Sequence, residues 1–312
     1  MRQLTDTVLM VSPDQFGFNP ETAATNVFQS KPGKAVSALL IRDKALAEFR
    51  RMVATLRKNG INVFILPSRK DATVPDAVFP NNWFSTHEEG IVVIYPMLAP
   101  NRRKERQTLV LKELLNKIGN THFKIFDFTW GENEGEILEG TGSLVLDRVH
   151  KMAWAMESPR TTKKAFEKWC KKMGYKPVFF HAYDKNSLPI YHTNVVMSLG
   201  NQFAVACLES INDPAERNMI STKLRESGKE IITITVDQLY AFCANILQLT
   251  SKKGGEKIIL SNTAFRAFKS FQIKRLQKYG ELIAINIPTI ERVGGGSARC
   301  MMAEVFLPGE RN

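Results

Sequence analysis

The sequence predicts an α/β fold with quasi-fivefold symmetry, built from five repeats of strand, strand, helix and strand. Two observations support this prediction. Five segments of helical character each end in a basic or polar turn and a glycine, and these glycines stand at positions 60, 119, 174, 228 and 280, at intervals of 59, 55, 54 and 52 residues. A short strand-like run follows each glycine. Regular spacing of this kind indicates an internally repeated architecture.

The helices are predicted from their apolar periodicity. The first, which ends in RRMVATLRKNG, follows a candidate N-cap at Asp43 and gathers one apolar face, made of Leu46, Phe49, Val53 and Leu56. The third, FEKWCKKMG, gathers a second such face, made of Phe166, Trp169, Cys170 and Met173. A glycine just past the last turn is the expected left-handed helix terminator.

Strands are predicted on both sides of each helix. The runs after the five glycines are 61–67, 122–128, 176–182, 230–236 and 281–288, and further runs lie at 90–96, 143–147, 194–200, 203–209 and 301–308. Five such units can close around an axis, each burying its helix on its own small sheet, so we predict one domain over residues 1–312. A doubly wound sheet, or two unrelated domains, would use the same alternation and remain the alternatives.

The composition is that of a packed globular protein, with 312 residues, 44% hydrophobic and 24% charged. No stretch of 18 apolar residues occurs, and the apolar run near the start, VLMV, is too short for a signal-peptide core, which favours a cytoplasmic protein without a membrane partner. Four scattered cysteines, without a C-x-x-C pair, indicate free thiols in a reducing compartment. Five histidines without an H-x-x-x-H pair give no support for a metal site.

The net charge of +12 and the pI near 9.5 raise the question of a nucleic-acid partner. The basic residues are spread along amphipathic helices, however, and do not form one cluster. Lys163, Lys164, Lys171 and Lys172, for example, alternate with apolar residues. Spread charge mainly affects solubility and non-specific attraction, so we predict no specific nucleic-acid partner.

Three residues could form a catalytic group where strand ends converge on a central axis. Cys300 follows the flexible GGGSAR segment, and the adjacent Arg299 would favour the reactive thiolate. His192 is predicted to open an apolar strand, where it could act as a base, and Glu139 precedes a Gly-Thr-Gly turn. Each residue taken alone is equally compatible with a structural role, as a buried thiol, a hydrogen-bonded imidazole or a turn-capping carboxylate.

The motifs EG-x-G, H-x-N and GGGSARC, one in each of three sections of the chain, together resemble the guanidino-group-modifying superfamily. This superfamily includes arginine deiminases, dimethylarginine dimethylaminohydrolases, amidinotransferases and succinylarginine dihydrolases. The resemblance covers essentially the whole chain. It is closest to the branch of citrulline ureidases (citrulline hydrolases), which the segments MVSPDQFGFNPETAATNVFQ and DAVFPNNWFSTH also resemble.

The resemblance implies the pentein fold, a five-bladed α/β-propeller, and a cysteine-dependent hydrolase without a metal or organic cofactor. It implies that Cys300 is the nucleophile, that His192 is the general acid and base, and that Glu139 holds the terminal nitrogens of the substrate. The substrate-binding residues that it implies or suggests are Asn82, Asn194, Asp76, Arg160 and Arg299. Asp76 would pair with an α-ammonium group, and Arg160, with help from Arg299, would pair with an α-carboxylate.

Asn82 and Asn194 stand where arginine deiminases have aspartates. A guanidinium group only donates hydrogen bonds, whereas an asparagine can also donate, for example to the carbonyl oxygen of a neutral ureido group. We therefore predict that citrulline is converted to ornithine, carbon dioxide and ammonia. Succinylarginine dihydrolases place an asparagine near a guanidinium, so arginine-like substrates remain an alternative.

Other functions are compatible with parts of the sequence. A hydrolase of arginine or dimethylarginine would use the same residues, and an amidinotransferase would pass the group to an amine instead of water. Ribosome anti-association factors share the fold but lack the Cys–His–Glu set, and a cysteine protease would use a Cys–His pair. The predicted partner is a small-molecule substrate, and a homodimer is left open.

Overall fold

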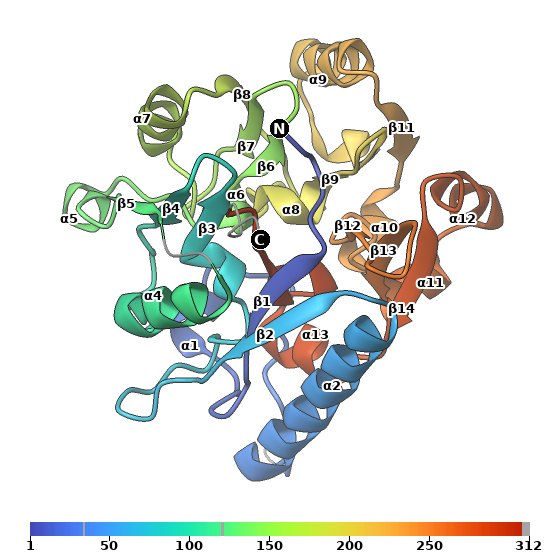
Figure 1. The fold of residues 1–312 in the computed structure, drawn as a ribbon. Coiled ribbons are helices and arrows are strands. Elements are labelled where there is room, and N and C mark those ends of the chain that lie inside the picture. Colours follow the sequence, from blue (N-terminus) through green and yellow to red (C-terminus); the bar gives the residue numbers. More distant parts are fainter. Residues whose placement is uncertain (34, 120–121, 308–312) are drawn as a thin grey trace.

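The computed structural model describes residues 1–33, 35–119 and 122–307. Five three-stranded sheets surround the centre of the molecule, and the longer helices lie outside them (Figure 1). In every sheet the middle strand pairs antiparallel with one neighbour and parallel with the other. This arrangement confirms the five strand–strand–helix–strand repeats. The doubly wound sheet is wrong, because each of the described sheets has only three strands.

The repeats follow one another along the chain. The first contains β15 (Ala303–Glu304), β1 (Thr7–Val11), α2 (Ala38–Lys58) and β2 (Asn62–Leu66), and the second contains β3 (Phe84–His87), β4 (Ile91–Ile94), α3 (Pro100–Arg103), α4 (Thr108–Lys117) and β5 (Lys124–Asp127). The third contains β6 (Val145–Asp147), β7 (Met152–Met156), α7 (Lys163–Met173) and β8 (Lys176–Phe180). The fourth contains β9 (Met197–Leu199), β10 (Phe203–Ala206), α9 (Pro214–Glu226) and β11 (Glu230–Thr233), and the fifth contains β12 (Leu247–Thr250), β13 (Glu256–Ser261), α11 (Asn262–Ala267), α12 (Ser270–Leu276) and β14 (Glu281–Ile285).

Shorter elements connect these units. The α-helical ones are α1 (Pro20–Ala23), α5 (Gly131–Glu134), α6 (Gly140–Ser143), α8 (Thr193–Val196), α10 (Val236–Tyr240) and α13 (Pro288–Gly294). The 3-10 turns are η1 (Pro80–Asn82), η2 (Leu208–Ser210) and η3 (Ala298–Met301).

The first sheet is completed by residues from both ends of the described chain. Strand β15 pairs antiparallel with β1, matching Leu9 with Ala303, and β1 pairs parallel with β2. The first repeat thus receives its first strand from near the C-terminus. The predicted last strand was 301–308, but only 303–304 is paired, and Pro308 lies outside the described residues.

Two predicted helix boundaries are wrong. Helix α2 begins earlier than expected, because the hydroxyl of Ser37 caps it by accepting from the Leu40 N–H at 3.1 Å, and Asp43 lies exposed inside the helix. Helix α12 ends at Leu276, so Gly280 does not terminate it directly. Gly174 behaves as predicted, with φ 69° at the C-cap of α7.

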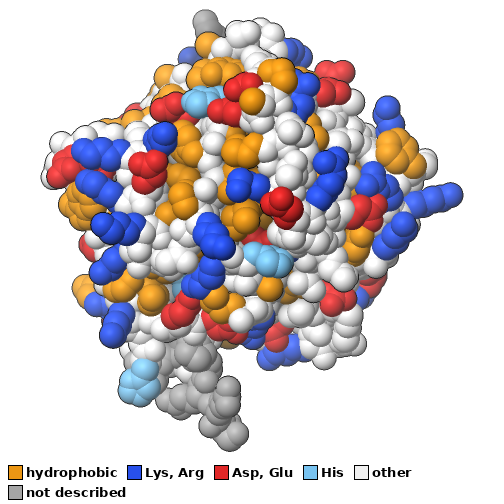
Figure 2. Space-filling model, turned by 90° about the horizontal axis from the view of Figure 1, so that it is seen from above, with side chains coloured by type: hydrophobic (Ala, Val, Ile, Leu, Met, Phe, Trp, Pro, Cys, Tyr) orange, Lys and Arg blue, Asp and Glu red, His pale blue; other side chains and the backbone are white. Residues whose placement is uncertain are grey.

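Each outer helix turns its apolar face toward the sheets. The four apolar residues predicted for α7 are all buried, in one cluster with residues of β4, β6 and β7. On the molecular face in Figure 2, basic side chains are interspersed with acidic and apolar ones. No described helix combines the length and the apolar character needed to cross a membrane.

A short helical turn precedes the inner strand in four of the five repeats. Turns η1, α6, α8 and η3 lead into β3, β6, β9 and β15, respectively. In Figure 1, α6 and α8 lie near the centre, at the inner ends of their sheets. In the fifth repeat, β12 follows a turn in which Phe242 has a φ of 60°. These turns carry the candidate catalytic residues toward the centre.

Candidate active site

The helical turns place Glu139, His192 and Cys300. Glu139 is the N-cap residue of α6, His192 is the N-cap residue of α8, and Cys300 lies within η3. The prediction that His192 opens a strand is wrong, since a helical turn separates it from β9. An N-cap residue has non-helical backbone and lies outside the helical turn, as the dihedral angles of Glu139 (φ -85°, ψ 73°) and His192 (φ -141°, ψ 143°) show. Here that geometry leaves the side chains of Glu139 and His192 free to meet.

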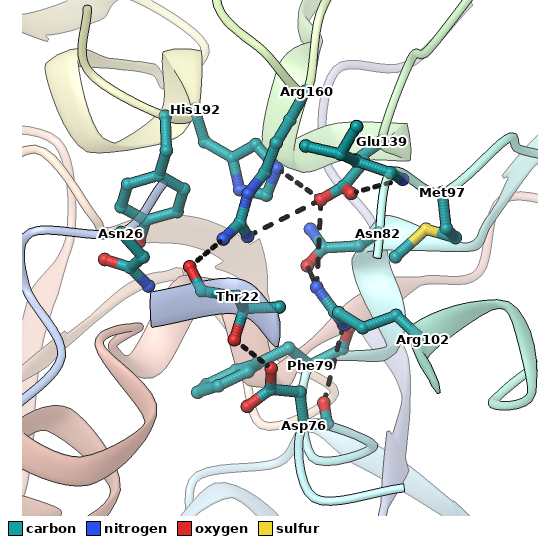
Figure 3. A network of polar contacts seen from close by, with 12 residues as sticks. Thr22, Asn26, Asp76, Phe79, Asn82, Met97, Arg102, Glu139, Arg160 and His192 are labelled. Carbon is teal, nitrogen blue, oxygen red and sulfur yellow. Dashed lines mark hydrogen bonds and ion pairs between the residues drawn. The ribbon is translucent and has the colours of Figure 1, made fainter. Parts of the chain in front are cut away.

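The carboxylate of Glu139 is the hub of a buried polar network (Figure 3). Its Oε2 lies 2.9 Å from Nε2 of His192, 3.7 Å from Arg160 Nη1 and 3.8 Å from Arg102 Nη1. Its Oε1 accepts from the backbone N–H of Leu98 at 3.0 Å. A buried carboxylate with this many donors stays ionised and fixed in position.

The electrostatics of the network favour an ionised Glu139 beside a neutral His192. Burial acts to raise the pKa of Glu139, but the charge of Arg160 and the bond from His192 outweigh it and lower that pKa to about 2. Burial lowers the pKa of His192 to about 4, although Glu139 opposes this shift. At neutral pH the imidazole therefore carries one proton, which Nε2 donates to the carboxylate, and Nδ1 is free to accept a proton.

Gly142 makes room for the imidazole. A Cβ atom at this position would lie 2.7 Å from Nδ1 of His192 and 2.5 Å from Nδ2 of Asn82. In this chain Asn82 and His192 occupy the space that any side chain at 142 would need.

Arg102 fixes the orientation of Asn82. Its Nη1 donates to Asn82 Oδ1 at 2.7 Å, so the amide NH2 of Asn82 points away from Arg102. One of these N–H groups reaches Asn81 Oδ1 at 3.2 Å, and the NH2 faces the space beside Gly142. Asn82 thus presents donors, and no acceptor, toward His192.

No sequence motif marks Arg102 as a functional residue, because it lies in the basic run NRRKER and resembles a solvated charge. It is fully buried and pairs with Glu105 at 2.8 Å. Burial acts to lower the pKa of Arg102, but the charge of Glu105 outweighs this effect. The net result is a pKa above the usual range of arginine. Burial also raises the pKa of Glu105, to about 7, despite Arg102. The spacing of Arg102 and Glu105, three residues apart, was the signal that could have suggested a pair.

Cys300 is buried, and amide groups surround its sulfur. Nδ2 of Asn245 lies 3.1 Å from Sγ, and Nδ2 of Asn194 lies 3.6 Å from it while also donating to Thr141 O at 3.1 Å. Burial, and next the Cys300 sulfur, raise the pKa of Tyr191 well above its ordinary value. The structure therefore brings Cys300 and Asn194 together and adds Asn245, which no sequence motif indicated.

The glycines before Cys300 allow close backbone packing. A Cβ atom at Gly294 or Gly296 would lie 2.9 Å from the ring of Phe79, and one at Gly295, where φ is 64°, would lie 2.6 Å from Asn26 Nδ2. Larger residues would push this segment away from its neighbours. The glycines thus let the chain carry Cys300 into the centre.

Asp76 and Arg160, which were expected to bind the α-ammonium and α-carboxylate groups of the substrate, both contact the segment 19–26. Oδ2 of Asp76 accepts from Asn19 at 2.7 Å and from Thr22 at 2.9 Å, whereas its buried Oδ1 has no hydrogen-bond partner. Arg160 donates to Thr22 O at 3.0 Å and to Thr25 Oγ1 at 2.9 Å. Asp76 and Arg160 therefore both contact Thr22 (Figure 3), and the free acceptor on Asp76 suits an ammonium group.

Arg299 does not join this network. Its guanidinium donates to Glu304 Oε2 at 3.1 Å and to Met302 O at 3.2 Å. It lines a cavity with about 460 Å³ of empty space, including its open mouth, and Asn194 and Thr141 also line this cavity. The expected roles of Arg299, in activating the sulfur and in binding a carboxylate, find no contact that supports them.

The described residues contain no group of three or more His, Cys, Asp or Glu side chains that could hold a metal ion.

The model of the family described as N,N dimethylarginine dimethylhydrolase, eukaryotic, matches residues 12–307. None of the curated proteins matches the sequence significantly.

Several solved structures share the fold. The structure of ArgZ, an arginine dihydrolase from the ornithine–ammonia cycle in cyanobacteria, has a TM-score of 0.75 and 16% identity, with 97% of this chain and 41% of that chain covered. The substrate-bound N-terminal domain of ArgZ has a TM-score of 0.73 and 16% identity, over 96% and 99% of the two chains. A cysteine-to-serine mutant of DDAH from Pseudomonas aeruginosa, in complex with citrulline, has a TM-score of 0.65 and 15% identity, over 97% and 99%. The chain thus spans less than half of the ArgZ chain in the first of these structures.

Proposed function

We propose, on the premise that this chain belongs to the N,N dimethylarginine dimethylhydrolase family, that it is a Cys300-dependent hydrolase of the terminal carbon–nitrogen group of an arginine-related amino acid. The family assignment agrees with the resemblance to guanidino-group-modifying enzymes seen in the sequence. The preferred substrate in this proposal is citrulline, and the products are ornithine, carbon dioxide and ammonia.

One observation supports the ureido substrate above the others. Because Arg102 binds Oδ1 of Asn82, the amide NH2 is the group that Asn82 turns toward His192. A ureido oxygen accepts hydrogen bonds, whereas a guanidinium offers only donors. A guanidinium beside Asn82 would therefore lack a charge-assisted hydrogen bond at this position. Losing one such contact costs about 1.5–3 kcal/mol of binding free energy, which corresponds to a preference for the ureido substrate of about tenfold or more.

The proposed reaction uses the geometry of the network. The Cys300 thiolate attacks the planar carbon of the ureido group, and Asn82 and Asn194 donate to the oxygen as it becomes negative. Nδ1 of His192 takes the proton of the Cys300 thiol to form this thiolate and passes it to the departing nitrogen. It then takes a proton from water, and the resulting hydroxide releases the carbonyl group from sulfur as carbamate. Carbamate breaks down to carbon dioxide and ammonia. Glu139 holds the imidazole and accepts from the substrate's terminal N–H groups.

A second candidate is arginine, consumed to ornithine in two successive hydrolyses. The ionised Glu139 favours it, because a buried carboxylate is the acceptor that a guanidinium needs. ArgZ, which has a similar fold, is described as an arginine dihydrolase, and DDAH was crystallised with citrulline.

A substrate panel separates these candidates. Ammonia and ornithine should be measured with citrulline, arginine, agmatine, dimethylarginine and succinylarginine, each repeated with Cys300→Ala. Ornithine from citrulline, at a kcat/KM above that for arginine, is the expected result. Faster consumption of arginine with ornithine as product would favour the second candidate, and citrulline accumulating from dimethylarginine or arginine would contradict both.

A further inference from the structure

Asn245 is a fully buried amide in contact with the sulfur of Cys300. At 3.1 Å, its Nδ2 is closer to Sγ than Nδ2 of Asn194 is, and it also reaches the carbonyl oxygen of Asn194 at 3.2 Å. A thiolate accepts N–H hydrogen bonds more strongly than a thiol does, because the acceptor carries the charge. The contact therefore favours the form of the sulfur that attacks carbon.

The side-chain carbonyl oxygen of Asn245 has no hydrogen-bond partner. Oδ1 of Asn245 is buried without a hydrogen bond, although buried polar atoms in proteins are nearly always paired. It belongs to the side chain whose NH2 touches the sulfur, so both polar atoms of this amide lie near Cys300. This unpaired acceptor suits an N–H or O–H group that is not part of the chain.

The backbone before Asn245 is constrained as well. Phe242 has a φ of 60°, a left-handed conformation that is rare for an aromatic residue, and its carbonyl oxygen accepts from the Asn245 N–H at 2.9 Å. Conformations of this kind persist where the surrounding structure requires them, and they are frequent at functional sites. Here the turn leads directly from Phe242 to the residue that contacts Cys300.

We infer that Asn245 is a further catalytic residue, whose NH2 holds and stabilises the Cys300 thiolate and whose Oδ1 accepts from the group that approaches the sulfur, either a substrate N–H or the hydrolytic water. Asn245 itself forms no covalent bond and gains or loses no proton. The inference rests on the proposed function for its chemistry. The contact with the sulfur does not depend on which arginine-related substrate is used.

Alkylation of the sulfur tests this role without a substrate. Iodoacetamide labelling of Cys300 near neutral pH, followed by mass spectrometry of the peptide that contains it, would be compared in the wild type, Asn245→Asp and Asn245→Ala. The aspartate keeps the size of the side chain but lacks N–H donors and repels a thiolate. Labelling should slow about tenfold or more in both variants, since a hydrogen bond to a charged group is lost. With the substrate found by the panel, kcat should fall by a similar factor and KM should change less.

Matched variants separate this role from a structural one. Ser198→Ala removes a buried hydroxyl without a partner from β9, and it should label and melt like the wild type. Asn245→Ser, which keeps a short donor near the sulfur, should recover part of the labelling rate lost in Asn245→Asp, and it provides a second readout if the alanine variant fails to fold. Wild-type labelling rates in folded Asn245→Asp would overturn the inference. Slowed labelling together with no turnover of any substrate would refute the proposed function and leave the role of Asn245 standing.

Discussion

Nε2 of His192 lies 2.9 Å from Oε2 of Glu139, across 53 positions of sequence. Both residues are the caps of one-turn helices that lead into inner strands of neighbouring repeats. The two helices, α6 and α8, both lie near the centre of the molecule (Figure 1), where these two caps meet. The pairing of acid and base therefore follows from the repetition of one local structure, and it sets the tautomer of His192.

Cys300→Ala should abolish hydrolysis. Removing a nucleophile whose neighbours act as a unit lowers kcat by about a thousandfold to a millionfold, because the remaining groups cannot form the covalent intermediate. Ammonia release measures the loss. Cys243→Ala is the control, since Cys243 is equally buried but its recorded contact is with Ala264 O at 3.5 Å, and it should keep nearly full activity. Turnover by Cys300→Ala would remove the basis of the proposed function.

Asn82→Asp should shift specificity from citrulline toward arginine. The substitution keeps an oxygen for Arg102 but replaces the NH2 donors with a charged acceptor beside Gly142. We expect the ratio of kcat/KM for arginine to that for citrulline to rise about tenfold or more. The control is Asn62→Asp, at an amide that contacts the Thr7 hydroxyl on β1, where this ratio should stay constant. An unchanged ratio in Asn82→Asp would mean that Asn82 does not select the substrate.

Gly142→Ala should lower kcat strongly, although it removes no functional group. The added Cβ would lie 2.5 Å from Asn82 Nδ2 and 2.7 Å from two atoms of the His192 ring, so the imidazole must move. Misplacing a catalytic group by about 1 Å can cost a hundredfold in rate, and we expect a loss in kcat of about this size. Gly17→Ala, at a glycine with no heavy atom within 4 Å of a built Cβ, should behave like the wild type. Full activity of Gly142→Ala would contradict the placement of His192.

The contribution of His192 to the stability of the fold should fall as the pH drops below 6.5. The pKa of His192 is lowered from 6.5 to about 4, so its contribution to stability is complete above pH 6.5 and is lost as the pH falls through 4, because only the unfolded chain binds the proton in between. The pKa of Glu139 is lowered from 4.5 to about 2, so its contribution is lost in the same direction at lower pH. Glu105, with its pKa raised to about 7, acts in the opposite direction between pH 4.5 and 7.

Melting temperatures of the wild type and His192→Gln isolate the histidine. Glutamine has no titration in this range, so the difference in melting temperature between the two proteins should be larger at pH 7 than at pH 4. The Glu105 contribution is common to both and cancels. A constant difference over this range would mean that the imidazole is not held neutral by the fold.

The sequence by itself determined the repeat and most of its elements. Glycines at regular spacing, with amphipathic helices before them and strand-like runs after them, specify five similar units, because local propensity and apolar periodicity depend on residues close together in the chain. The motif around Cys300 and its order after Glu139 and His192 were also readable, since each is a short local pattern.

The tertiary structure decided which side chains meet and which atoms they present. Arg102 and Asn245 have no local signature, and their contacts with Asn82 and Cys300 come from residues 20 and 55 positions away. Arg299, adjacent to Cys300 in sequence, instead pairs with Glu304. The physical reason is that burial and the competition among neighbouring donors and acceptors set the direction of each polar group, and these quantities exist only once the repeats have packed around their centre.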